Sequence, residues 1–194
     1  MSQPAPVLRM TYAEYLELER SSEVKHEYLR GEAFALAGGS PEHSRLAANL
    51  IGELRAALRG RPCAVFTSDA RVRIEATDRT TYPDVSVVCH RLQHAADDPE
   101  AIVNPVVIVE VLSGATEADD RGEKFAHYRR LPSLREYVLV SQRATRIEVY
   151  RRQDDRWVLA EAGAGEALRL ESIDVALSVD EVYRDPLAAP GAGS

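Results

Sequence analysis

Apolar and polar residues follow each other along the chain in patterns that predict a domain of mixed helices and strands. Leucines recur at helical spacing from Leu46 to Leu58 and predict the longest helix, which Ser40 caps and Pro41 begins. The run "NPVVIVEVLSG", residues 104–114, is almost continuously apolar and β-branched, a pattern typical of a central strand that is covered on both faces.

Shorter patterns predict the elements on either side. Thr11 and Glu14 form a capping box for a short first helix, and the alternation around Arg30-Gly31 predicts a tight hairpin. Strands are predicted in "CAVFTSDARVRI" and "YPDVSVVCH", and the polar segment "EATDRTT" between them is interpreted as a turn.

The second half of the chain continues the alternation of strands and helices. Asp120 and Glu123 predict the cap of a helix that runs through Lys124 until Pro132 ends it. The segments "EYVLVS", "RIEVYRRQ" and "RWVLAEA" then predict a meander, and Ser178 caps a final short helix. This order predicts an α/β fold with a mixed central sheet flanked by helices. We expect one domain over 10–185, with flexible termini at 1–9 and 186–194.

Composition supports a single globular domain of 194 residues, with 45% hydrophobic and 28% charged residues. The sequence has no signal-peptide pattern and no run long enough to span a membrane, so we expect a cytoplasmic protein. Cys63 and Cys89 stand in apolar runs without CxxC spacing and are interpreted as buried hydrophobic residues rather than a disulfide. The net charge of −7 argues against nonspecific binding of nucleic acid, so an anionic ligand requires a local group of arginines.

Glu110 is the strongest physical anomaly in the sequence. A carboxylate inside "VVIVEVL" would cost several kcal/mol if it were ionised and unpaired in a core. An arginine partner or an exposed strand end would explain it, and so would a functional role. Asp84, which opens the strand "YPDVSVVCH", favours function, because two carboxylates at adjacent strand ends can hold a hard cation such as Mg²⁺.

Lys124 lies near the start of the helix that follows the Glu110 strand. If this helix folds back over the strand, the lysine would reach the carboxylates, where it could orient or deprotonate water and stabilise charge on phosphate. A solvated lysine on the helix surface is the alternative. The chain contains only two lysines, Lys25 and Lys124, among its 24 basic residues, which makes the position of Lys124 informative.

The stretches "YPD", "VVIVEVLS" and "DRGEKFAHY" resemble the bacterial family called putative restriction endonucleases, a branch of the PD-(D/E)XK nuclease-like superfamily. The resemblance covers most of residues 10–152, from "MTYAEYLEL" to "LREYVLVSQRATRIEVYR". It implies a restriction-endonuclease-like fold in which Asp84, Glu110 and the backbone carbonyl of Val111 hold Mg²⁺ or Mn²⁺. Leu112 stands where the superfamily expects its lysine, so the resemblance assigns the catalytic role to Lys124 on the following helix.

Three further residues, Glu27, His43 and Asp69, match the same pattern. Glu27 would hold a second metal or a metal-bound water, or would pair with Lys25 or Arg30 on the surface. His43 would contact phosphate or the water around the metal, or would have no role beyond the start of its helix. Asp69 is interpreted as a turn residue. Tyr128 lies four residues after Lys124 on the same helical face, where it orients the lysine or only packs.

The leading hypothesis is a metal-dependent endonuclease that hydrolyses DNA by means of an activated water. Six arginines are candidates for contacts with the DNA phosphates: Arg45, Arg71, Arg73, Arg121, Arg129 and Arg130. Cutting both strands of a duplex requires two active sites, which favours a homodimer. The alternative is a catalytically silent nuclease-like module that binds nucleic acid or protein. A hydrolase of sugars or nucleotides that uses the carboxylates as an acid/base pair ranks last, because it leaves Lys124 without a role.

Overall fold

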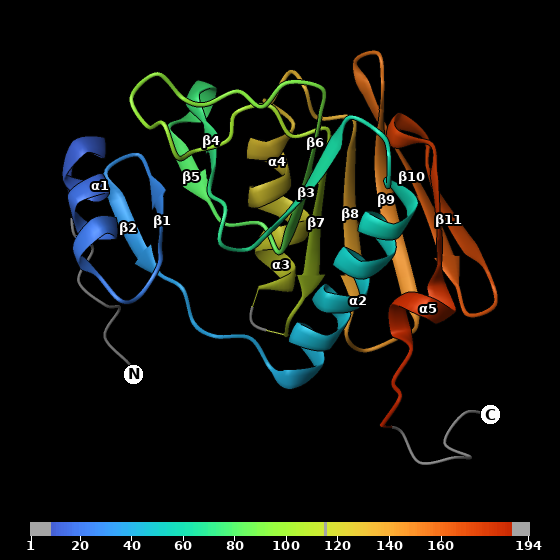
Figure 1. Ribbon diagram of the computed structural model, residues 1–194. Helices are drawn as coiled ribbons and strands as arrows, with labels where there is room; N and C mark the ends of the chain where they lie inside the picture. The colour runs from blue at the N-terminus through green and yellow to red at the C-terminus, as the bar shows by residue number, and fades with distance from the viewer. Residues whose placement is uncertain (1–8, 115, 188–194) are drawn as a thin grey trace.

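The structure, a computed structural model, describes residues 9–114 and 116–187 and has the predicted α/β architecture, with a mixed central sheet flanked by helices. The termini predicted to be flexible fall almost entirely outside the described residues. Six strands form the central sheet in the order β10-β9-β8-β7-β6-β3 (Figure 1): β3 Cys63–Thr67, β6 Val85–Cys89, β7 Val107–Leu112, β8 Glu136–Ser141, β9 Arg146–Gln153 and β10 Arg156–Gly163. Only β7 and β8 are parallel within this sheet, so a crossover must connect them.

The crossover is a helical segment that covers one face of the central sheet. It consists of α3 (Glu117–Asp119), a π-helical turn (Asp120–Lys124) and α4 (Phe125–Tyr128). The opposite face is covered by α2 (Pro41–Ala57), with α5 (Val179–Tyr183) beside it (Figure 1). Every residue of β7 is buried because helices pack on both of its faces, as its unbroken apolar sequence predicts.

A smaller sheet lies beside the central one, in the order β2-β1-β5-β4. Its strands are β1 His26–Leu29, β2 Glu32–Ala35, β4 Val72–Ile74 and β5 Arg79–Thr81, and α1 (Tyr12–Ser21) packs against it. The interpretation of "EATDRTT" as a turn was therefore wrong for its second half. Only Glu75–Thr77 forms a short 3₁₀ turn, whereas β5 is fully buried although its side chains are polar.

The local signals at the β1–β2 turn and at three helix starts are confirmed. Arg30 and Gly31 both have positive φ, 48° and 90°, and form the two-residue turn between β1 and β2. The capping box at Thr11 and the caps at Ser40 and Ser178 are present. The sequence patterns did not reveal the short hairpin of β11 (Ala167–Leu170) and β12 (Val175–Ser178), whose strands are joined by the 3₁₀ turn Glu171–Ile173.

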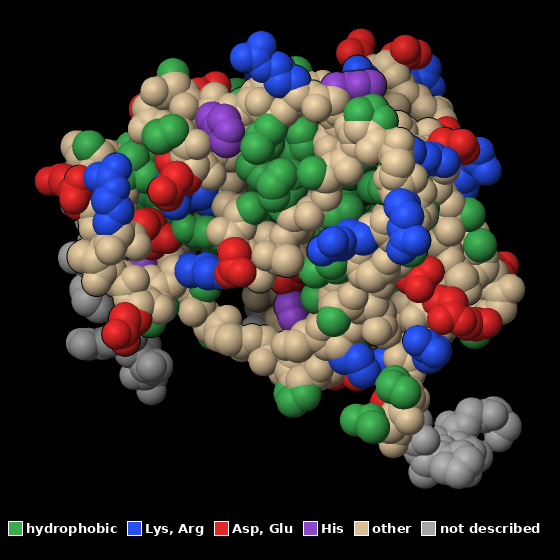
Figure 2. All heavy atoms as spheres, viewed as in Figure 1, with side chains coloured by type: hydrophobic (Ala, Val, Ile, Leu, Met, Phe, Trp, Pro, Cys, Tyr) green, Lys and Arg blue, Asp and Glu red, His purple; other side chains and the backbone are tan. Residues whose placement is uncertain are grey.

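The surface is hollowed beside the segment that joins β2 to α2. Figure 2 shows histidine and acidic side chains inside this recess, which lies near the N-terminal end of α2. The recess therefore gives solvent a route toward buried polar groups of the sheet. Within the described residues, the structure contains no helix that meets the length and hydropathy needed to cross a membrane.

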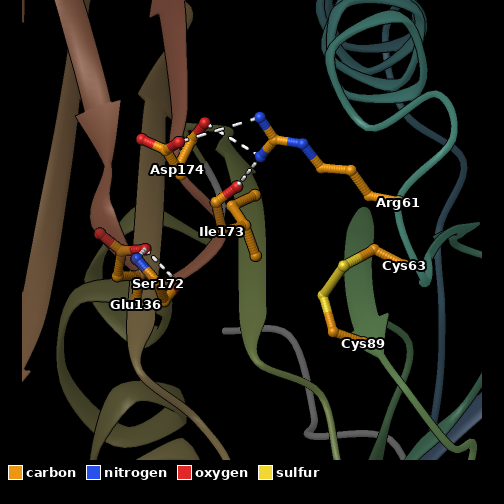
Figure 3. Close-up of a disulfide and its surroundings, with 7 residues drawn as sticks. All are labelled: Arg61, Cys63, Cys89, Glu136, Ser172, Ile173 and Asp174. Atoms are coloured by element: carbon orange, nitrogen blue, oxygen red, sulfur yellow. Dashed lines mark hydrogen bonds and ion pairs between the residues drawn. A yellow bond between two sulfur atoms is a disulfide. The ribbon is translucent and has the colours of Figure 1, made fainter.

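Cys63 and Cys89 form a disulfide, so the interpretation of these residues as separate buried hydrophobic side chains was wrong (Figure 3). They are direct partners in the antiparallel register of β3 and β6, with 4.0 Å between their Cα atoms. Close by, Arg61 Nη1 donates a hydrogen bond of 2.6 Å to the carbonyl of Ile173. These two connections fasten the edge strand β3 to its neighbour and to the β11–β12 hairpin.

Candidate active site

Asp84 and Glu110 face each other where β6 begins. The antiparallel register pairs Val85 with Val109, so the next pair beyond the ladder is Asp84 with Glu110. The Asp84 amide donates to Glu110 Oε2 at 3.4 Å, and the Val111 amide donates to Asp84 Oδ2 at 2.7 Å. The structure therefore brings together the three residues that the sequence assigns to a metal site.

Glu110 is almost fully buried, with 3% of its surface exposed. Burial raises the pKa of Glu110 to about 8, and the charges of Asp84 and Asp120 add to the rise while Lys124 opposes it. One lysine does not balance this group of carboxylates. The site therefore favours additional positive charge near Glu110.

Lys124 reaches Glu110 from the crossover, as the sequence predicts. Its Nζ lies 3.2 Å from Glu110 Oε1, 3.2 Å from Asp120 Oδ1 and 3.4 Å from Glu27 Oε1. Burial alone would lower the pKa of Lys124, but the three carboxylates hold it well above its usual value. The side chain is thus a charged donor, and the interpretation of Lys124 as a solvated surface residue is wrong.

Asp120 belongs to this cluster and does not cap a helix, contrary to the sequence prediction. The crossover helix starts earlier, since the Glu117 amide already donates to the Ser113 carbonyl. Asp120 and Lys124 bound a π-helical turn, a local widening that is frequent at functional sites. Burial raises the pKa of Asp120, and the Lys124 ammonium, 3.2 Å from its Oδ1, opposes this rise. In the sequence, the spacing of four residues between Asp120 and Lys124 was the signal that the two side chains lie on one face of a helix.

Glu27 enters the cluster from β1 and is not a surface residue. It accepts hydrogen bonds from the Thr81 hydroxyl and, at 3.2 Å, from Arg79 Nη2. Burial would raise the pKa of Glu27, but Lys124, Thr81 and Arg79 together lower it. Sequence reasoning missed Thr81 and Arg79 because both lie in β5, the segment interpreted as a turn.

Tyr128 connects the crossover directly to the central strand. Its hydroxyl donates to Glu110 Oε1 at 2.8 Å and lies 3.4 Å from Thr81 Oγ1. Lys124 and Tyr128 therefore contact the same oxygen of Glu110 from successive turns of one helix. Of the two alternatives predicted for Tyr128, the structure favours an orienting role over simple packing, but the group that its hydroxyl contacts is Glu110 and not Lys124.

His43 forms the open side of the site. Its Nε2 lies 3.1 Å from Asp84 Oδ2, and its backbone amide donates to the Ser40 cap of α2. The hydrogen bond to Asp84 raises the pKa of His43, and the charges of Asp84 and Asp120 act in the same direction. The side chains of His43 and Asp84 are 19% and 16% exposed, compared with 4% for Glu110, so the cluster opens to solvent at this pair.

The remaining predicted residues lie elsewhere. Asp69 is an exposed turn residue paired with Lys25, in agreement with its interpretation as part of a turn. Four of the six arginines predicted to grip DNA are occupied by carboxylate partners: Arg45 by Glu42, Arg71 by Asp98, Arg73 by Asp78 and Arg121 by Glu148. Arg129 and Arg130 are exposed and free of such ion pairs among the described residues.

Comparison with known proteins gives consistent matches over most of the chain. A family model named Uma2 and described as "Putative restriction endonuclease" matches residues 12–180. Two uncharacterized proteins of Synechocystis sp. (strain ATCC 27184 / PCC 6803 / Kazusa) are similar. One, slr1290, is 38% identical over 94% of this chain and 96% of its own length. The other, sll1609, is 37% identical over 78% and 86%. The crystal structure of a putative nuclease of DUF820 from Anabaena variabilis ATCC 29413 has the same fold, with a TM-score of 0.73 at 18% identity, covering 90% of this chain and 97% of that one.

Proposed function

The chain belongs to the putative restriction endonuclease family, and from this membership we propose that it is a metal-dependent endonuclease that hydrolyses phosphodiester bonds of DNA. One observation carries the proposal: the buried Glu110 carboxylate lies opposite Asp84 and 3.2 Å from the Lys124 ammonium. A central strand gains no stability from a carboxylate whose pKa is raised to about 8. Its presence is explained if the reaction requires it.

The donor set fits a divalent cation. No group of three or more histidine, cysteine or acidic side chains within 9–114 and 116–187 is arranged to hold a metal. Asp84, Glu110 and the Val111 carbonyl form a smaller set of two carboxylates and one backbone oxygen, which suits Mg²⁺ or Mn²⁺ because these ions keep several waters. Asp84 Oδ2 accepts hydrogen bonds, whereas its Oδ1 has none from the described residues, so one oxygen is available to a cation.

When bound at these oxygens, the ion would polarise a phosphate oxygen and lower the pKa of a coordinated water. Lys124 supplies fixed positive charge beside the same carboxylates. Because the pKa of Lys124 is held well above its usual value, we assign it to stabilising the negative charge that develops on phosphate, and not to removing a proton.

Other residues of the cluster hold the reacting groups in position. Tyr128 keeps Glu110 Oε1 turned toward the crossover, which leaves Oε2 on the side of Asp84. Glu27 restrains the Lys124 ammonium from β1. His43 stands at the opening of the site, where its raised pKa favours the charged imidazolium that can contact an incoming phosphate.

The proposal is tested by incubating the purified protein with supercoiled plasmid in Mg²⁺, in Mn²⁺ and in EDTA. We expect nicking that requires the metal and that Glu110→Gln and Lys124→Met each abolish. Glu148→Gln is the matched control, because Glu148 is also a buried carboxylate but pairs with Arg121 away from Glu110. Nicking that survives Glu110→Gln would refute the assignment of the site.

The second candidate is the catalytically silent nuclease-like module. It is favoured by the net charge of −7 and by the enclosure of Lys124 within three carboxylates. Absence of cleavage on plasmid, single-stranded DNA and RNA in both metals would select this alternative over the endonuclease.

A further inference from the structure

Two arginines face each other across β8 and β9. The register pairs Glu136 with Arg151, so Arg135 and Arg152 form the next pair, and the Arg152 amide donates to the Arg135 carbonyl at 2.8 Å. Like charges directly opposite each other in a sheet are destabilising. Burial and the charge of Arg135 both lower the pKa of Arg152, which is consistent with repulsion between the two guanidinium groups.

Two more arginines join this pair at the end of α4. Arg152 Nη2 donates to the carbonyls of Arg129, at 2.7 Å, and of Leu131, at 2.9 Å, which connects the residues that follow α4 to β9. We name Arg129, Arg130, Arg135 and Arg152 the arginine patch. None of its four members forms an ion pair within the part of the chain that the structure describes.

Aromatic rings support two of these guanidinium groups. The Arg129 Cζ lies 5.0 Å from the centre of the Phe125 ring, and the Arg152 Cζ lies 4.8 Å from that of Trp157. Such cation–π contacts hold the planar groups without neutralising their charge. Arg129, Arg130 and Arg135 are exposed, so their N–H groups remain available to a ligand.

We propose that the arginine patch binds the phosphate backbone of DNA. A chain with a net charge of −7 that keeps four unpaired arginines together has a surface complementary to a polyanion. Guanidinium forks match phosphate oxygens in geometry as well as in charge. Asp154 and Asp155 of the β9–β10 turn are followed by Arg156, so the patch together with this turn has five arginines and two aspartates, a net charge of +3.

The patch lies at the end of the central sheet opposite to the opening of the candidate site at His43 and Asp84. The Arg135 amide donates to the Val106 carbonyl, four residues before Glu110 on the same strand segment. Four residues of strand span about 13 Å, and β7 is buried along this length, so the patch is a surface separate from the candidate site. The choice of DNA over another polyanion rests on the proposed function, whereas the existence of a polyanion site does not.

The test measures binding without cleavage. Fluorescence anisotropy of a labelled duplex of random sequence, with the full chain in EDTA, gives affinity over a range of NaCl concentrations. We compare wild type with the triple variant Arg129→Gln, Arg130→Gln and Arg135→Gln, and leave Arg152 in place because it bonds α4. We expect affinity to fall on the order of tenfold and the slope of log affinity against log salt to fall by roughly 2 to 3.

The matched control replaces Arg55, Arg59 and Arg91 by Gln. These residues are likewise exposed and form no ion pair among the described residues, so the net charge changes equally. An equal loss in both triple variants, or no loss in the patch variant, overturns the proposal, and the second result points to an acidic protein as the partner. If DNA binding depends on the arginine patch but plasmid is not nicked in Mg²⁺ or Mn²⁺, the endonuclease proposal is refuted and the proposal for the patch is retained.

Discussion

The Tyr128 hydroxyl donates a hydrogen bond of 2.8 Å to Glu110 Oε1, and this bond joins the crossover helix to the central strand at the carboxylate of the candidate site. Replacing Tyr128 by Phe removes only this donor. We expect plasmid nicking to fall by about 10- to 100-fold, the usual effect of losing a residue that orients a metal ligand. Nicking rates measured at saturating Mg²⁺ and at limiting Mg²⁺ separate a weaker metal affinity from a slower reaction.

Tyr183→Phe is the control for this change. Its hydroxyl also donates to backbone carbonyls, those of Ser141 and Arg146, but it lies on α5 and makes no contact with Glu110. Equal activity of Tyr128→Phe and Tyr183→Phe would show that the hydrogen bond to Glu110 is structural only.

Two adjacent glycines allow His43 to be moved without being replaced. A Cβ on Gly39 would lie 2.8 Å from His43 Nδ1 and 3.0 Å from its Cγ, whereas a Cβ on Gly38 would meet nothing within 4 Å. We expect Gly39→Ala to displace the imidazole from Asp84 and to lower nicking by about tenfold or more, and Gly38→Ala to leave it unchanged. Both variants should melt at similar temperatures. Full activity of Gly39→Ala would remove His43 from the site.

The sequence was sufficient to predict the elements whose signals are local. The run around Glu110 is apolar enough to require a central strand, and Ser40-Pro41 is sufficient to begin a helix. The pairing of Asp84 with Glu110 followed from their positions on two strands, with the family resemblance in support. The structure of these segments could be predicted because it depends on residues that are close together in the sequence.

The parts that the sequence did not predict depend on contacts between distant segments. The buried polar strand β5 is stabilised by partners that come from far along the chain, such as Glu27 for Thr81. The disulfide required the register of β3 and β6, which no pattern around Cys63 reveals. Asp120 lies within the helical crossover because this segment starts about one turn earlier than predicted, where the Glu117 amide donates to the Ser113 carbonyl.

The Cys63–Cys89 disulfide leads to a prediction about stability. It closes a loop with a sequence separation of 26 residues, for which loop-closure entropy predicts a contribution of about 2–4 kcal/mol. We expect a thiol reductant to lower the free energy of unfolding by this amount, measured by urea titration. The double variant Cys63→Ala and Cys89→Ala should unfold identically with and without reductant. A wild-type protein that is insensitive to reductant would contradict the prediction.

The buried pair of Asp98 and Arg71 predicts a loss of stability in acid. Arg71 donates to both oxygens of Asp98, at 2.6 and 2.7 Å, and Asp98 is 1% exposed. Burial alone would raise the pKa of Asp98, but the hydrogen bonds and charge of Arg71 lower it in the folded state. The stabilisation is therefore complete above the unfolded pKa of about 4 and is lost as pH falls through the lower folded pKa.

Asp98→Asn should reduce the free energy of unfolding by about 3–5 kcal/mol at neutral pH, because it removes the buried partner of Arg71 and leaves only the exposed Glu100. The difference from wild type should shrink in urea titrations carried out below about pH 4. Asp69→Asn is the control, since the ion pair of Asp69 with Lys25 is exposed and should contribute no more than about 1 kcal/mol. A constant difference between Asp98→Asn and wild type at all pH values would contradict this account.

Variants of Glu110 and Lys124 distinguish a catalytic role of these residues from a structural one. Because burial raises the pKa of Glu110 to about 8, removing its charge with Glu110→Gln should leave the protein at least as stable as wild type. Lys124→Met should instead cost about 3–5 kcal/mol, since it leaves Glu27, Glu110 and Asp120 without their shared cation.

In the double variant, Glu110→Gln removes one of the charges that Lys124→Met leaves unpaired. We therefore expect its loss of stability to be smaller than the sum of the single losses, by about 1–3 kcal/mol. Nicking should remain absent in all three variants. A protein whose fold tolerates the loss of Glu110 but whose reaction does not would retain this carboxylate for catalysis. A large loss of stability in Glu110→Gln alone would instead make the cluster a structural network and favour the silent module.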